Sequence, residues 1–158
     1  MPFQIGDRIA HPLHGAGIIQ SVETRRVSGR YTQFYILKII GSGMIVLVPV
    51  DSCGKIGVRA ISSPEEIEAL FRAVPDIRVD MLDNWNKRYR ENMQRIKSGD
   101  ILEVAGVIKG LIQRDSDRGL STGERRMLNS AKQILLSEIA LSLGVSYDDA
   151  EQRLLSCM

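Results

Sequence analysis

The feature that most constrains the fold of this chain is a change of hydrophobic period at residues 63–64. Before it, short runs rich in Ile, Val, Leu and aromatic residues lie between glycine-containing turns, a pattern typical of strands. After it, apolar residues recur every three to four positions, as they do on amphipathic helices. The sequence therefore predicts an α+β protein with a small antiparallel sheet in its N-terminal part and helices in the remainder.

Four strands are predicted in the N-terminal part, over residues 7–10, 17–24, 31–40 and 43–49. Tight turns should join them into an antiparallel meander that curls into a small sheet or barrel, because closure removes exposed edges. The last run ends at Pro49, which cannot donate to a ladder and therefore favours a strand end or a sheet edge. An apolar edge strand is either covered by the rest of the chain or open to a partner strand.

The helical part begins with Ser63 as N-cap and Pro64 at the first helical position, and this first helix should run to about residue 74. Residues 76–82 then read as a linker. Further helices are predicted over residues 83–97, 100–114 and 123–143, with a short last one from about residue 146. The helix over 100–114 is apolar round more than half its circumference, which places it at the centre of a bundle.

Composition limits the class of protein. The 44% apolar and 25% charged residues are ordinary for a globular chain, and no run approaches the roughly 20 apolar residues that span a bilayer. No secretion signal is visible at the start, so we expect a cytoplasmic protein. Cys53 and Cys157 lie far apart and in no ligand-like spacing, which predicts reduced thiols with no metal or disulfide role.

The single tryptophan, Trp85, stands at the start of the most basic stretch of the chain. Residues 84–97 contain five cations and one anion, and residues 84–132 carry a net charge of +5 in a chain whose total is +2. Cations beside a flat apolar ring suit a surface that neutralises phosphates and presses the ring against bases. Local sequence equally allows Trp85 to be a core residue on an amphipathic helix whose charged face is solvated.

Signals of enzyme chemistry are weak. The chain has no phosphate-binding loop and no nucleophile elbow. His11 and His14 are separated by Pro12, so they cannot form a helical ligand pair, and a turn is the expected structure there. Residues 115–117 resemble the start of a calcium loop but lack its later ligands, so a loop between helices is expected. We therefore predict a protein that is not an enzyme and that holds no cofactor and no metal.

Taken together, several segments resemble the CarD/CdnL family of bacterial transcription regulators along essentially the whole chain. The matching segments are Phe3-Gln4-Ile5-Gly6-Asp7, His11-Pro12-Leu13-His14-Gly15, Val48-Pro49, Val58-Arg59, Asn84-Trp85-Asn86-Lys87-Arg88-Tyr89-Arg90, and Gly119-Leu120-Ser121-Thr122-Gly123-Glu124-Arg125-Arg126-Met127-Leu128. Each of the first segments is weak alone, but in this order and spacing, with the last two, they are highly specific.

The resemblance implies a Tudor-like β-barrel over residues 1–62 that docks on the β subunit of RNA polymerase. It implies a helix and linker over 63–82, and a helical DNA-binding domain over 83–158. That domain would contact the minor groove and phosphates of promoter DNA at the upstream edge of the melted region, with little reading of sequence. Members of this kind stabilise the open promoter complex, and a monomer is expected.

On the DNA side, the resemblance implies that Trp85 is the wedge of the family, an aromatic ring inserted at a base step of the promoter DNA. The expected phosphate contacts are Lys87, Arg88, Arg90 and Arg125. The first three cannot all face the same way on one helix, so at least one should be solvated or paired with Glu91. Tyr89 and Met93 either form an apolar seat for the indole or belong to the core stripe.

On the polymerase side, the resemblance indicates Arg25, Leu47 and Pro49. Some members have arginine at position 47, so leucine there predicts a more apolar contact; alternatively, Leu47 belongs to the barrel core. A second function is also open, in which the chain is a protein–protein adaptor on RNA polymerase without a DNA wedge.

Overall fold

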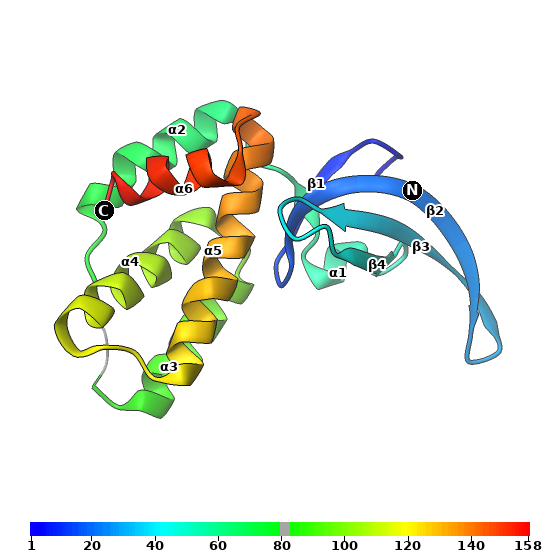
Figure 1. Cartoon of the computed structure of the whole chain (residues 1–158). Coiled ribbons are helices and arrows are strands. Elements are labelled where there is room, and N and C mark those ends of the chain that lie inside the picture. The colour runs from blue at the N-terminus through cyan, green and yellow to red at the C-terminus, as the bar shows by residue number, and fades with distance from the viewer. Residues whose placement is uncertain (80–82) are drawn as a thin grey trace.

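The computed structural model describes residues 1–79 and 83–158, and the α+β class is confirmed. The strands are β1 (Arg8–His11), β2 (Gly15–Val27), β3 (Arg30–Ile39), β4 (Ile45–Pro49) and β5 (Arg59–Ala60). The helices are α1 (Cys53–Ile56), α2 (Pro64–Ala73), α3 (Trp85–Lys97), α4 (Ile101–Arg118), α5 (Thr122–Leu143) and α6 (Tyr147–Leu155), with a short 3-10 turn at Val74–Asp76. Figure 1 shows the sheet and the short helix α1 on one side of the molecule and helices α2 to α6 on the other, with α5 beside the sheet.

The five strands form one antiparallel sheet in the order β4-β3-β2-β1-β5. Its outer strands, β4 and β5, are not paired with each other anywhere in residues 1–79 and 83–158, so the sheet is curved but not closed. Of the two expected forms, the structure has the curled sheet and not the closed barrel. The physical reason is the shortness of β5, whose two residues pair only with Ile9 and Ala10.

The longest ladder joins β2 to β3, and it extends well past the rest of the sheet (Figure 1). Its two-residue turn places Ser28 at φ 51° and Gly29 at φ 78°. Two successive positive φ angles give the turn the right-handed twist that matches the strands. Strand β2 consequently reaches Val27, three residues beyond the predicted end at residue 24.

The predicted helix starts agree with the structure. Ser63 and Glu66 form a reciprocal capping box, and the side chains of Asp100, Ser121 and Ser146 accept backbone N–H groups at the starts of α4, α5 and α6. The largest difference is at the end of α4, because residues 115–117 are its last turn and not the predicted loop. The helix ends only at Gly119, whose φ of 78° stops it.

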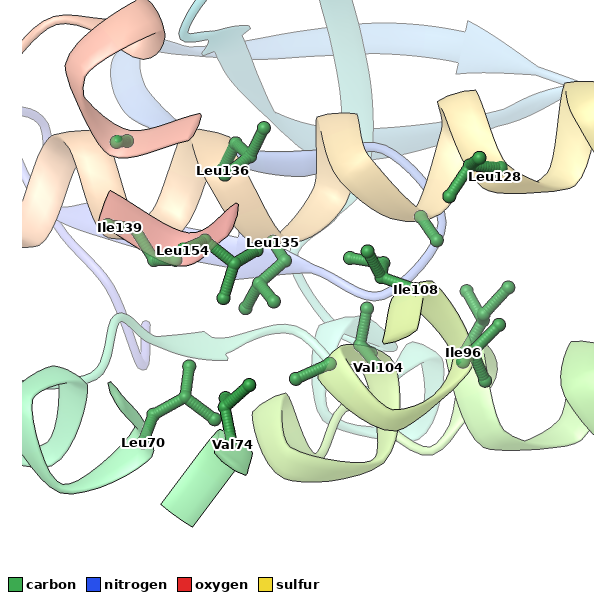
Figure 2. Close-up of a cluster of buried hydrophobic side chains, with 14 of the residues drawn as sticks. Leu70, Val74, Ile96, Val104, Ile108, Leu128, Leu135, Leu136, Ile139 and Leu154 are labelled. Atoms are coloured by element: carbon green, nitrogen blue, oxygen red, sulfur yellow. The ribbon is translucent and has the colours of Figure 1, made fainter. Parts of the chain in front are cut away.

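Two apolar cores correspond to the two parts of the chain. The smaller lies against the sheet and includes Ile9, Ile19, Tyr35 and Leu37. The larger is built by the helices, and Figure 2 shows Leu70 and Val74 in the same cluster as Ile108 and Leu135. Helix α2 therefore packs into the helical core, although it lies in the segment 63–82 between the two predicted domains. Residues 80–82 at the end of that segment lie outside the described part of the chain.

Candidate functional site

The indole of Trp85 lies at the surface, at the first residue of α3. Its exposed fraction is 42%, so it is not a core residue. Asn84 caps the helix by accepting the backbone N–H of Lys87 at 3.1 Å. The indole stacks on Tyr89, with ring centroids 5.0 Å apart and planes 18° from parallel. Tyr89 therefore supports the indole from one turn below while also packing against the helical core.

A hydroxyl at the start of α5 fixes the polar edge of the indole. The Nε1–H of Trp85 donates to the Oγ of Ser121 at 3.1 Å. That oxygen also accepts the backbone N–H of Glu124 at 3.1 Å and donates to the Oε1 of Glu124 at 3.3 Å. A hydroxyl has one donor and two acceptor positions, and all three are used here. The orientation of the indole is thus tied to the N-cap of another helix.

Gly123 on α5 lies against the two stacked rings. A Cβ at this position would lie 3.4 Å from Cζ2 of Trp85 and 3.9 Å from Cε2 of Tyr89, which is ordinary van der Waals contact. Sequence reasoning missed Ser121 and Gly123 as site residues, because a capping box by itself indicates only a helix start.

Arg88 is not available to a phosphate, which corrects one of the predicted DNA contacts. Its Nε donates to Oε2 of Glu124 at 2.8 Å and its Nη2 to Oε1 at 3.2 Å, with both side chains only 2% exposed. Its Nη1 donates to the carbonyl of Asp83 at 3.1 Å. One of the three neighbouring cations is indeed turned away, but its partner is Glu124 and not Glu91. Arg88 holds α3 against α5 beneath the indole.

The carboxylate of Glu124 is stabilised in its charged form. Burial alone would raise its pKa, but the hydrogen bond and charge of Arg88, together with the charge of Arg114, bring the pKa of Glu124 below its ordinary value. Arg114 contributes at a longer distance, with its Nε 3.9 Å from Oε1. A carboxylate that accepts hydrogen bonds from the guanidinium of Arg88 and the hydroxyl of Ser121, with Arg114 as a second nearby charge, is a fixed anchor for the elements around Trp85.

The other predicted phosphate contacts are at the surface. Lys87 and Arg90 are exposed and, three residues apart, share the outward face of α3. Arg125 on α5 is exposed and pairs with Asp115, with its Nη2 3.1 Å from Oδ1. Arg126, which the prediction did not include, is also exposed and lines a groove with Tyr89 and Gly123. The two helices that position the indole therefore carry several exposed cations besides the buried Arg88.

The predicted polymerase contacts lie on the sheet. Leu47 is 37% exposed on edge strand β4, so it is not enclosed in the core, and Ile45 on the same strand is 52% exposed. Pro49 ends β4, where it is opposite Phe34. Arg25 lies on β2 and pairs with Glu23 at 2.9 Å. The structure does not bring Arg25 next to Leu47, because β3 lies between their strands.

The histidine pair is structural. The Nδ1 of His11 accepts the backbone N–H of Leu13 at 3.1 Å, and its ring centroid lies 4.6 Å from that of His14. Burial, with the charge of His14 second, lowers the pKa of His11 to about 4. Residues 1–79 and 83–158 contain no cluster of three His, Cys, Asp or Glu side chains able to hold a metal ion. In the same residues, no helix has the length and hydropathy to cross a bilayer.

Two known protein domains match the chain, one over the sheet and one over the helical part. Residues 3–62 match the CarD-like/TRCF RID domain, and residues 69–155 match the CarD C-terminal domain. The chain is also 31% identical over 144 residues to "Putative transcription factor YdeB" of Bacillus subtilis (strain 168), covering 91% of this chain and 94% of that protein.

The chain belongs to the CarD family.

The predicted resemblance is thus confirmed, and with it the expectation that the chain is not an enzyme, since CarD-like proteins are non-enzymatic transcription regulators. The N-terminal sheet is of the type that interacts with RNA polymerase.

Proposed function

We propose that this CarD-family protein docks on the β subunit of RNA polymerase and stabilises the open promoter complex by contacting DNA at the upstream edge of the bubble. The observation that carries the proposal is the position of Trp85. Its ring is partly exposed, supported by Tyr89 and fixed by Ser121, at the start of a helix that also bears the exposed Lys87 and Arg90. A core tryptophan would have neither this exposure nor this setting.

A ring that enters a base step must offset an unstacking cost of a few kcal/mol. The step at the edge of a melted region is already weakened, so an indole binds there better than in intact duplex. Because the stacking and hydrogen bond of Trp85 already restrict its side chain, little rotamer entropy remains to be lost on insertion. Preference for the open state is what shifts the equilibrium toward it.

Phosphate contacts would position this wedge. Lys87, Arg90 and Arg125 remain candidates, and Arg126 joins them, since all four are exposed on α3 or α5, the helices that position the indole. Contacts to phosphates orient a protein without reading sequence, which fits a factor that acts at many promoters. Arg125 would have to exchange Asp115 for a phosphate, a small penalty for an exposed ion pair.

The polymerase contact would use edge strand β4. One side of β4 pairs with β3, and the other edge is the outer edge of the sheet, with Leu47 and Ile45 exposed along it. An unpaired edge with apolar side chains is suited to strand addition by a partner sheet. Arg25, two strands away, would meet an acidic group on the same partner.

The test is the lifetime of the open complex formed by RNA polymerase on a promoter. Trp85→Ala should shorten it about tenfold, equivalent to about 1.4 kcal/mol, while leaving the affinity for polymerase unchanged. Leu102→Ala is the matched control, because Leu102 has the same 42% exposure and lies on α4. Leu47→Glu should instead weaken binding to polymerase.

An unchanged lifetime with folded, polymerase-bound Trp85→Ala protein would exclude the wedge and leave the adaptor function. In that case, protection of upstream DNA from nuclease should be the same with and without the protein.

A further inference from the structure

The sheet and the helical part are joined by polar contacts that converge on one helix. Side chains of α5 bond to the sheet part at four positions. Gln133 donates to the carbonyl of Ile40 at 3.0 Å, Ser137 accepts the N–H of Ala16 at 2.8 Å, Glu138 binds Arg59 and Ser62, and Ser142 donates to the carbonyl of Ser62 at 2.7 Å. Hydrogen bonds are directional, so this interface specifies an orientation and not merely an association.

Arg59 is the most connected side chain of the interface. Its guanidinium makes five hydrogen bonds, as many as the group has N–H donors. Two go to the carboxylate of Glu138 on α5, at 2.7 and 2.9 Å, and two to the carbonyl of Gly99 in the turn between α3 and α4, at 3.1 and 2.9 Å. The fifth goes to the carbonyl of Ala60 at 3.1 Å. One side chain of β5 therefore fixes two separate points of the helical part.

Glu138 is saturated in the same way. Its Oε2 accepts from Arg59 and from both the N–H and the hydroxyl of Ser62, at 2.7, 2.8 and 2.7 Å. Its Oε1 accepts the second N–H of Arg59. Burial alone would lower the pKa of Arg59, but the hydrogen bond and charge of Glu138 raise it above its ordinary value. The charged form of Arg59 is thus stabilised by its contact with Glu138.

Close backbone approach adds a second, independent constraint. A Cβ on Gly15 would lie only 2.4 Å from Oγ of Ser137 and 3.2 Å from the carbonyl oxygen of Gln133. The φ of Gly15 is +103°, a backbone angle that residues other than glycine rarely adopt. The turn before β2 therefore rests directly on α5, and only glycine permits it.

The same helix carries the seat of the indole at its other end. Ser121 and Glu124 at the start of α5 hold Trp85 and Arg88, and Glu138 lies fourteen residues further along. At 1.5 Å per residue this separation is about 21 Å along a continuous helix. Helix α5 thus connects the polymerase-facing sheet to the DNA-facing side chain without a flexible joint.

We propose that α5 is a rigid spacer that sets the position of Trp85 relative to the polymerase-facing sheet, with Arg59, Glu138 and Gly15 as positioning residues. The inference rests on the proposed function. A flexible connection between the two parts would only raise the effective concentration of Trp85 near the DNA. A rigid spacer also fixes the orientation of the indole relative to the sheet. The covalent link from β5 to α2 is only residues 61–63, so the side-chain contacts decide the orientation.

The experiment compares Glu138→Gln with Glu103→Gln as matched control. Glu103 pairs with Arg95 at 2.8 Å, but both belong to the helical part, so that ion pair does not join it to the sheet. Three quantities are measured: affinity for polymerase, affinity of the free protein for a fork-junction DNA by quenching of its single tryptophan, and the same affinity in the presence of polymerase. Glu138→Gln should leave the first two within about twofold and lower the third about tenfold.

A distance measurement keeps the test independent of function. Spin labels at Ser28→Cys on the hairpin and Asn129→Cys on α5, in a chain whose native cysteines are replaced by serine, report the relative position of the two parts. Glu138→Gln should broaden their distance distribution. Ser137→Ala is the milder second variant if the first does not fold. It removes the bond from the N–H of Ala16 and a local bond from Ser137 Oγ to the carbonyl of Ile134 within α5.

Unchanged distributions in both variants would overturn the proposal, because these contacts would then not set the orientation. A broadened distribution with an unchanged third affinity would overturn it as well, because orientation would not matter to the wedge. The proposed function itself fails if Trp85→Ala leaves the open-complex lifetime unchanged and polymerase does not raise the affinity of the wild-type protein for fork-junction DNA. This holds whatever the distance distributions show.

Discussion

Helix α5 carries two buried glutamates, Glu124 and Glu138, and each forms a bidentate ion pair with an arginine. The two pairs differ in how far they are exposed to water. At the start of the helix, the side chains of Glu124 and Arg88 are both 2% exposed. Toward its other end, Glu138 is 3% exposed while Arg59 is 35% exposed. The first pair is sealed inside the helical part, and the second joins two parts of the molecule with one side open to water.

This difference teaches what each pair is suited to do. Removing one member of a sealed pair leaves an uncompensated charge in a low-dielectric interior, which is strongly destabilising. Water can solvate the exposed side of Arg59 if its partner is lost. We therefore expect the pair under the indole to matter most for stability, and the pair at the sheet to matter most for orientation.

The largest predicted effect tests this contrast directly. Glu124→Gln should lower the free energy of unfolding by about 3 kcal/mol at neutral pH, because the buried guanidinium of Arg88 loses its counter-charge. Glu138→Gln should cost about half as much, because Arg59 is partly solvated. Urea denaturation measures both. Equal losses would contradict the distinction between a sealed and an open pair.

The pH dependence of this contrast has a definite sign. Because the folded-state pKa of Glu124 is lowered, its stabilising contribution is complete above the ordinary value of 4.5 and is lost as the pH falls through the folded pKa. The difference between wild type and Glu124→Gln should shrink over that range.

The next largest effect concerns His11. This residue ends strand β1 and lines a small cavity together with Arg59 and Glu138. Its pKa is about 4 in the folded protein and ordinarily 6.5, so the unfolded chain binds the extra proton between these values. Folding stability should fall by about 2 to 3 kcal/mol as the pH drops from 6.5 to 4. His11→Asn, which retains an acceptor for the N–H of Leu13, should remove this slope in denaturation measured across pH. A slope that persists in the variant would assign it to other groups.

At the DNA-facing end, Ser121→Ala should cost about 1 kcal/mol, the usual value of an N-cap. Its more specific effect is on Trp85, which loses the acceptor of its Nε1–H. The fluorescence anisotropy of the single tryptophan should fall, since the indole gains mobility. Ser146→Ala, which removes the equivalent cap of α6, serves as control and should leave the anisotropy unchanged.

The smallest effect on stability is expected at Arg125. Arg125→Ala should change the free energy of unfolding by less than about 0.5 kcal/mol, because its pair with Asp115 is exposed. If Arg125 contacts a phosphate, the slope of log affinity for fork DNA against log salt should decrease in magnitude by about 1. Arg153→Ala is the control, since Arg153 forms a similarly exposed pair on α6. A salt slope equal to that of wild type would remove Arg125 from the DNA contacts.

Sequence reasoning succeeded where the signal is local. The caps at Ser63, Asp100 and Ser121 depend on side chains that bond to backbone groups two or three residues away, so spacing along the chain was enough to predict them. Edge strand β4 was indicated by Pro49, whose missing N–H is a property of the residue itself. The extra turn of α4 was missed because polar residues at 115–117 are equally compatible with a loop.

For the site, too, local features were predicted from the sequence and those that depend on distant residues were not. Sequence placed Trp85 at the start of a basic helix, and the family resemblance identified it as the candidate wedge. It could not choose which of three neighbouring cations is buried, because the answer depends on Glu124, thirty-six residues away. The same holds for Ser121 and Gly123, whose roles appear only when α5 is packed against α3.

What the amino-acid sequence determined by itself is therefore the order of β1 to β4 and of α2 to α6, most of their caps and turns, and the presence of a lone tryptophan among cations, whereas α1 and β5 were missed. These follow from backbone geometry and from bonds between near neighbours. Only the tertiary structure decided that the sheet stays open, that Arg88 faces inward, and that Arg59 and Glu138 join the two parts. Each of these depends on groups far apart in the chain, whose charges and hydrogen bonds are satisfied only after the helices and the sheet have packed together.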